Sequence, residues 1–115
     1  MHFSERRKYE RRPYIKPLRY YLTASHMGEI KVEKIEYKGV SFDISERGFG
    51  MTTPYLLNVG DILFFKDEIK VNNFVANSGV VKWVFSLKDT TCRLGLEFSD
   101  LRLKRHTRVT LFNEK

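Results

Sequence analysis

Hydrophobic and polar residues alternate along most of the chain, which is the pattern of half-buried β-strands. The alternation starts at Leu18 and returns several times, each time after residues that favour turns. We expect strands over residues 18–24, 40–44, 49–51, 62–65, 74–85 and 92–98, and a weakly marked one within 29–38. Residues 74–85 are apolar on both faces, which indicates a central or strongly bent strand. Gly79 within it would permit a bulge or a barrel corner.

The end of the chain has a different pattern. Ser99 or Asp100 can cap a helix, which we expect to run to about Leu111. Its apolar side would consist of Leu101, Val109 and Phe112. The other side is basic, which fits a solvated face or a docking surface for an acidic partner, and membrane insertion is not expected. Short strands separated by turns predict a mainly β fold, a small antiparallel β-barrel of about six strands with a C-terminal α-helix.

The first 17 residues are dominated by Arg, Lys, Glu, Tyr and Pro, and Pro13 and Pro17 argue against a long helix there. We expect a flexible basic arm over residues 1–17 and a barrel over 18–115. With 115 residues, of which 42% are hydrophobic, the chain can build one core and no second folded unit. The sequence therefore predicts a single domain preceded by an arm.

Charge and cysteine content restrict the partners and the chemistry. A formal net charge of +7 favours an anionic partner, whether a nucleotide, a nucleic acid, an acidic protein or an anionic membrane surface. Cys92 is the only cysteine, which excludes an intramolecular disulfide and fits a reducing cytosol. No apolar run approaches the ~18 residues of a spanning helix. We therefore predict a cytoplasmic protein.

Catalytic and metal-binding signals are lacking in the sequence. His2, His26 and His106 stand in separate contexts without metal-ligand spacing, and Cys92 alternates with apolar neighbours like a buried strand residue. The chain also has no glycine-rich phosphate loop. We expect no enzyme, no metal and no cofactor.

An arginine cluster near the start of the chain is the first candidate for binding. Arg7 and Arg11 are four residues apart, with Arg6 and Arg12 beside them. Arginine forks match phosphate oxygens and also the O6/N7 edge of guanine. The alternative is a solvated basic tail.

The second candidate is the Asp-x-Ser-x-x-Gly segment formed by Asp43, Ser45 and Gly48 at the end of an expected strand. Its carboxylate can accept hydrogen bonds from N1–H and the amino group of guanine. The alternative is a turn in which Asp and Ser bond to nearby backbone and Gly supplies a positive φ. Both interpretations can hold at once.

Together the two segments resemble the PilZ domain, a bacterial receptor module for the second messenger cyclic di-GMP. The family pattern is Arg-x-x-x-Arg on an N-terminal arm, followed by Asp/Asn-x-Ser-x-x-Gly on the barrel. Its five positions are filled by Arg7, Arg11, Asp43, Ser45 and Gly48. The expected strand over residues 92–98 is also similar to the last strand before the helix of the family, so the resemblance covers nearly the whole chain.

The resemblance implies roles for these residues. Arg7 and Arg11 would grip phosphates and guanine edges. The facing wall of the site would be formed by Asp43, Ser45 and Gly48.

Other positions receive less specific roles from the same resemblance. An arginine at position 6 is linked in the family to a mutually intercalated ligand pair rather than a single ligand. Trp83 stands where some members carry an aromatic residue near the ligand, and its alternative is a core position on a long strand. Arg12 and Pro13 depart locally from the usual motif, which bears on stoichiometry more than on binding.

We therefore predict a non-enzymatic cyclic di-GMP receptor or adaptor that switches the conformation of its arm and signals through an unidentified effector protein. One alternative is a small basic barrel that binds RNA or single-stranded DNA through aromatic residues such as Tyr20, Tyr21 or Phe49, although nucleic acid is the less favoured partner. Another is a PilZ-like scaffold that binds only protein. Salt distinguishes the nucleic-acid alternative, because binding to many phosphates weakens steeply as salt rises.

Overall fold

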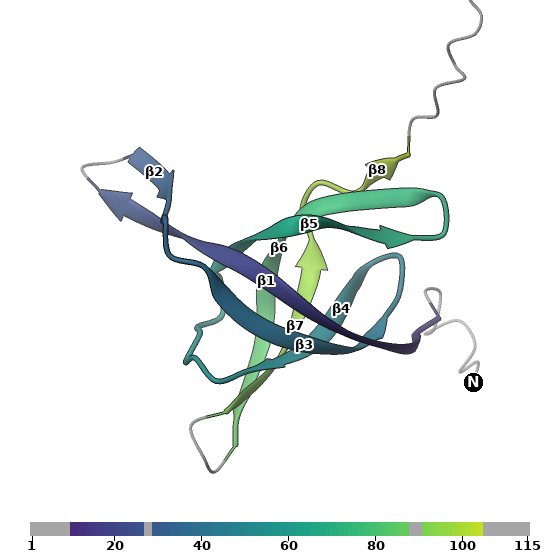
Figure 1. Cartoon of the computed structure of the whole chain (residues 1–115), viewed down its shortest axis with the longest axis horizontal. Coiled ribbons are helices and arrows are strands. Elements are labelled where there is room, and N and C mark those ends of the chain that lie inside the picture. The colour runs from purple at the N-terminus through teal and green to yellow at the C-terminus, as the bar shows by residue number, and fades with distance from the viewer. Residues whose placement is uncertain (1–9, 27–28, 88–90, 105–115) are drawn as a thin grey trace, which may run out of the picture.

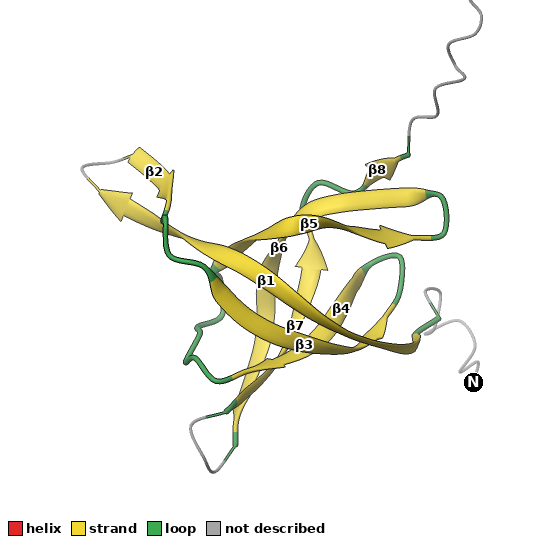
Figure 2. Cartoon of the chain, in the orientation of Figure 1, coloured by secondary structure: helices red, strands yellow, loops and turns green. Residues whose placement is uncertain are grey.

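The computed structural model describes residues 10–26, 29–87 and 91–104 (Figure 1). Within these ranges the chain forms strands joined by loops and turns, and no helix (Figure 2). The strands are β1 (Arg12–His26), β2 (Glu29–Val32), β3 (Tyr37–Ile44), β4 (Gly48–Thr53), β5 (Ile62–Val71), β6 (Phe74–Ser86), β7 (Cys92–Phe98) and β8 (Arg102–Leu103). None of the described segments is a helix long and apolar enough to cross a membrane.

Six of the strands close into an antiparallel barrel. The sheet order is β2-β1-β3-β4-β7-β6-β5, and β5 pairs with β1 as well, which closes the circle. Closure gives the backbone groups of these strands partners on both sides. The short strands β2 and β8 lie outside this circle, where β2 pairs with β1 and β8 pairs with β6 (Figure 1). The prediction of a small antiparallel barrel is confirmed.

Alternate residues of the barrel strands point inward and form one core. Phe49 and Met51 on β4 are fully buried, and Phe49 packs against Phe65 with ring centroids 5.3 Å apart. Tyr20 is also fully buried, and its hydroxyl lies 2.7 Å from Thr53 Oγ1. Burial raises the pKa of Tyr20 to about 12. Tyr20 and Phe49 are therefore unavailable for stacking on nucleic acid, contrary to the alternative given above.

The first strand begins at Arg12, six residues before the expected start at Leu18. The prolines were expected to lie in an arm before the first strand, but they lie within β1, whose pairing with β3 shifts register between Pro13 and Lys16. Ser41 supplies hydrogen bonds where the register shifts. Its buried Oγ accepts from the Lys16 N–H (3.1 Å) and donates to the carbonyl of Tyr14 (2.6 Å). Residues 12–17 thus lie within β1, so this strand begins earlier than the sequence pattern indicated.

The expected C-terminal helix is not confirmed: it does not occur over residues 99–104, where Arg102–Leu103 instead form β8. Asp100 does not cap a helix, because its carboxylate accepts from the N–H groups of Asn77 (2.9 Å) and Ser78 (3.0 Å) on β6. Arg102 donates to the same carboxylate (3.0 Å) and to Asn77. These bonds hold the chain beside β6. The rest of the expected helix lies outside the described residues.

Bulges occur at other positions than Gly79. The pairing of β5 with β6 shifts between Phe64 and Ile69, and that of β6 with β7 shifts between Val81 and Trp83. Alternation would place Trp83 on the inner face with Val81. The shift instead leaves Trp83 45% exposed while Val81 is fully buried. The alternative of a core position for Trp83 was therefore wrong.

Candidate functional site

The Asp-x-Ser-x-x-Gly segment forms the tight connection between β3 and β4. The Ser45 N–H donates to the Gly48 carbonyl (2.8 Å), and the Arg47 N–H donates to Ser45 Oγ (3.1 Å). Ser45 is only 1% exposed. Its hydroxyl is thus used within the turn, as the turn interpretation expected. A direct ligand contact by Ser45 remains a prediction.

Gly48 is required by close packing and not by its backbone angle. Among the described glycines only Gly60 has a positive φ. A Cβ atom on Gly48 would overlap the carbonyl oxygen of Leu96 and lie 2.9 Å from the Cα atom of Glu97, both on β7. The glycine therefore allows the start of β4 to approach β7.

The two motifs meet through Arg11 and Asp43. Arg11 Nη2 donates to Asp43 Oδ1 (2.7 Å) and Arg11 Nε donates to Oδ2 (3.1 Å), a bidentate ion pair. The start of β1 makes this contact possible, since Pro13 pairs with Asp43. The hydrogen bond to Asp43 raises the pKa of Arg11. Both side chains stay partly exposed, so the pair is open to a ligand.

Asp43 is also anchored to the barrel. Its Oδ1 accepts from the Gly50 N–H on β4 (3.2 Å). The carboxylate is therefore held from two sides, by a backbone donor and by the arginine fork. Arg6 and Arg7 lie outside the described residues, so the structure does not test their roles.

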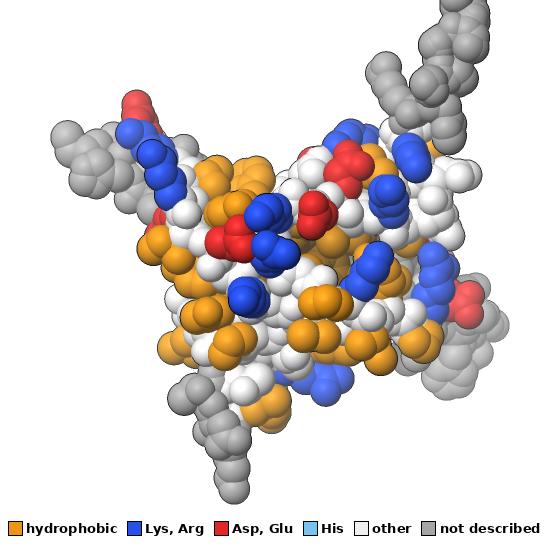
Figure 3. Space-filling view, in the orientation of Figure 1, with side chains coloured by type: hydrophobic (Ala, Val, Ile, Leu, Met, Phe, Trp, Pro, Cys, Tyr) orange, Lys and Arg blue, Asp and Glu red, His pale blue; other side chains and the backbone are white. Residues whose placement is uncertain are grey.

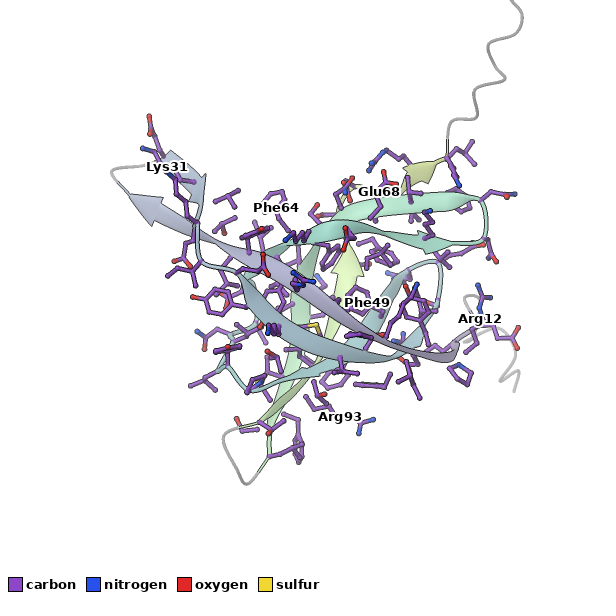
Figure 4. The ribbon with its side chains drawn as sticks, in the orientation of Figure 1. Arg12, Lys31, Phe49, Phe64, Glu68 and Arg93 are labelled. Carbon is purple, nitrogen blue, oxygen red and sulfur yellow. The ribbon has the colours of Figure 1, made fainter. Side chains whose placement is uncertain are left out.

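A polar bridge that the sequence did not predict lies beside this pair. Arg12 Nη2 donates to Asn72 Oδ1 (3.0 Å), and Asn72 Nδ2 donates to Glu46 Oε2 (2.6 Å). Asn72 occupies the turn between β5 and β6 with φ of 56°, a conformation that Asn tolerates. In the sequence, the pair Asn72-Asn73 indicates a turn at this position and gives no sign of the contacts with Arg12 and Glu46. The bridge ties this hairpin to the motif turn and to the start of β1, where Figure 4 labels Arg12.

A flat floor lies next to Asp43 on the outside of the barrel. Gly50 on β4 pairs with Gly95 on β7, and neither has a side chain. The ring of Phe42 covers Gly50, since a Cβ there would lie 2.5 Å from Phe42 Cε1 and 3.0 Å from Asp43 Oδ1. The indole of Trp83 covers Gly95 in the same way, with Cε2 at 2.5 Å. We call Gly50 and Gly95 the glycine floor; Asp43 and Trp83 thus border one outer face.

The charges near the motif turn are mostly paired. Arg47 Nε donates to Glu97 Oε2 (2.9 Å), and Lys82 Nζ lies 3.5 Å from Oε1 of the same carboxylate. The bond from Arg47 lowers the pKa of Glu97. On the face shown in Figure 3, basic side chains are spread among acidic and hydrophobic ones. Among the described residues, that face shows no continuous basic track for a nucleic-acid backbone.

No group of three or more His, Cys, Asp or Glu side chains within the described ranges could hold a metal ion. Cys92 is buried with a free thiol, as its alternation with apolar neighbours predicted. The site is therefore built from arginine, carboxylate and aromatic groups, which suit a ligand with anionic and planar parts.

Comparison with known proteins identifies the family of the chain. A family model described as PilZ domain matches residues 5–112, which is nearly the whole chain and includes both motif segments. A search of curated proteins found no match. The match supports the resemblance that was read from the five motif residues. The chain belongs to the PilZ domain family.

Proposed function

We propose that this protein is a receptor for cyclic di-GMP that acts without catalysis. Membership of the PilZ family suggests this role. The observation that carries the proposal is the bidentate contact between Arg11 and Asp43, which joins the two motifs beside the exposed Trp83. A guanine nucleotide needs both kinds of group, cationic donors for its phosphates and O6/N7 edge and a carboxylate for its N1–H edge.

Binding would exchange partners at this pair. Without ligand, Arg11 and Asp43 satisfy each other. With ligand, Arg11 would donate to a phosphate or to the O6/N7 edge of guanine, and Asp43 would accept from N1–H and the amino group. Arg7 would add a second fork, and Arg6 would favour a pair of ligands over one. The exposed Trp83 indole offers a face on which a base can stack.

Ser45 and Gly48 would act mainly by shaping the turn. The Ser45 hydroxyl fixes the turn, and Gly48 lets β4 approach β7. Both therefore hold Asp43 at the end of β3, from where it reaches the ligand. Ligand contacts by the backbone of this turn are compatible with that role.

The output would be a change of surface. The arm would close over the bound ligand because its arginines gain phosphate partners, and an effector protein would bind the new surface. The barrel itself is closed by pairing on all sides, so we expect it to serve as a rigid support.

Calorimetric titration tests the proposal. The protein should bind cyclic di-GMP saturably and in preference to cyclic di-AMP, with a short RNA as a further control. The Asp43→Ala variant should lose most of the preference for guanine. Binding to RNA alone would favour the nucleic-acid alternative, and no binding to any of them would favour a scaffold for proteins.

A further inference from the structure

Arg93 is a cation that neither motif includes, and it points outward from β7 (Figure 4). Its guanidinium carbon lies 4.2 Å from the centroid of the Phe42 ring. That ring in turn covers Gly50, directly beside the Asp43 carboxylate. Arg93 therefore borders the same outer face as Asp43, with its guanidinium over the Phe42 ring.

The donors of Arg93 are unused within the described part of the chain. The other described arginines each donate to a neighbouring carboxylate or amide: Arg11, Arg12, Arg19, Arg47 and Arg102. Arg93 has only the aromatic ring as a partner among the described residues. Stacking on a ring orients a guanidinium but leaves its N–H groups free at the edge of the plane. The N–H groups of Arg93 are thus available to an anionic acceptor such as a phosphate.

The charges of the site favour a further cation near the bound phosphates. Cyclic di-GMP carries two phosphate charges, and Asp43 repels them while it neutralises Arg11. Lys82 near the floor is paired with Glu97. In the described ranges, the Arg93 charge therefore lies close to the glycine floor without a compensating carboxylate.

We propose that Arg93 is a further ligand-binding residue, which contacts a phosphate of a cyclic dinucleotide bound against the Phe42 and Trp83 rings that cover the glycine floor. Phe42 is then a positioning residue, because its ring holds the guanidinium over the sheet. The proposal rests on the proposed function. It adds to that function a phosphate contact from the barrel itself, independent of the arm.

The test compares the affinity for cyclic di-GMP of the wild type, Arg93→Ala, Arg93→Lys and Arg19→Ala. Arg19 is the matched control, because it is an exposed arginine on β1 that pairs with Glu36 and lies outside the site. The Arg93→Ala variant loses one charge-assisted contact, so it should bind cyclic di-GMP roughly 10- to 150-fold more weakly than the wild type. Arg93→Lys should be intermediate, since lysine keeps the charge without the planar fork. Arg19→Ala should bind like the wild type.

Two further readouts separate a ligand contact from damage to the barrel. All variants should melt close to the wild-type temperature, because these side chains are exposed. The affinity of Arg93→Ala should depend less on salt than that of the wild type, since one exposed charge contact is missing. Equal binding by Arg93→Ala and Arg19→Ala, with a wild type that binds, would overturn the inference alone. A wild type that does not bind would overturn the proposed function, and the inference with it.

Discussion

Replacing Gly48 by alanine should destabilise the barrel itself. The added methyl carbon would overlap the Leu96 carbonyl oxygen and lie 2.8 Å from the Leu96 carbonyl carbon and 2.9 Å from the Glu97 Cα atom. All three atoms belong to the backbone of β7, which pairs with Gly48 directly. No flexible side chain can move aside, so β4 and β7 must separate in a closed barrel. Relieving this overlap therefore lowers the free energy of unfolding.

The magnitude follows from the kind of contact. Overpacking by a methyl group usually costs about 1–3 kcal/mol of unfolding free energy. Because backbone must move on both sides here, we expect the upper end, about 3 kcal/mol. For a domain of this size, that corresponds to a fall of about 10–15 °C in Tm.

Thermal and urea denaturation measure this loss of stability, with Gly79→Ala as the matched control. A Cβ on Gly79 would lie 3.1 Å from the Glu97 carbonyl oxygen and 3.4 Å from the Phe65 ring, so small shifts suffice. We expect that variant to lose less than about 1 kcal/mol. If Gly48→Ala were as stable as Gly79→Ala and yet failed to bind cyclic di-GMP, the glycine would serve the ligand and the packing argument would be refuted.

Two further predictions concern charged groups. Arg11→Ala and Asp43→Ala should each weaken cyclic di-GMP binding roughly 10- to 150-fold by calorimetry while costing less than about 1 kcal/mol of stability, because the pair is partly exposed; wild-type affinity in both variants would contradict this. The hydrogen bonds from Lys66 and Arg19 lower the pKa of Glu36 below its ordinary value of 4.5. The stabilisation by ionised Glu36 is therefore complete above about pH 4.5 and disappears as pH falls through the lower folded-state value. When the pH is lowered below 4.5, the Tm of Glu36→Gln should fall less than the Tm of the wild type. An equal fall in both proteins would refute the stabilising role of ionised Glu36.

The barrel could be predicted where one face of a strand is buried. The strand from Cys92 to Phe98 alternates regularly and occurs with those bounds. The start of β1 could not be predicted, because Pro13 and Pro17 carry the signals of an irregular segment. The buried hydroxyl of Ser41 allows this segment to join the sheet, because it accepts a hydrogen bond from the Lys16 N–H. The two residues are 25 positions apart, so no local sequence pattern contains this contact.

The same limit explains the C-terminal error. Asp100 has the chemistry of a helix cap, and the sequence does not say which N–H groups it will meet. In the structure those groups belong to Asn77 and Ser78 on β6. Long-range pairing thus overrode a correct local preference.

The site was predictable in its composition and less so in its geometry. The resemblance named Arg11 and Asp43, which the structure brings into contact. The outward direction of Trp83 depends on a register shift after Val81, which alternation alone gets wrong. Arg93 drew no attention in the sequence, because its contact with Phe42 joins residues from two strands that are not neighbours in the sheet.

The most direct test of the central claim is an NMR titration of the isotope-labelled protein with cyclic di-GMP. The account predicts that chemical-shift changes cluster at Asp43, Gly50 and Gly95, and at the indole N–H of Trp83, which is the only tryptophan of the chain. Changes centred instead on the opposite part of the barrel, around Glu36 and Pro54, would place the ligand elsewhere. No change at saturating ligand would contradict the receptor function itself.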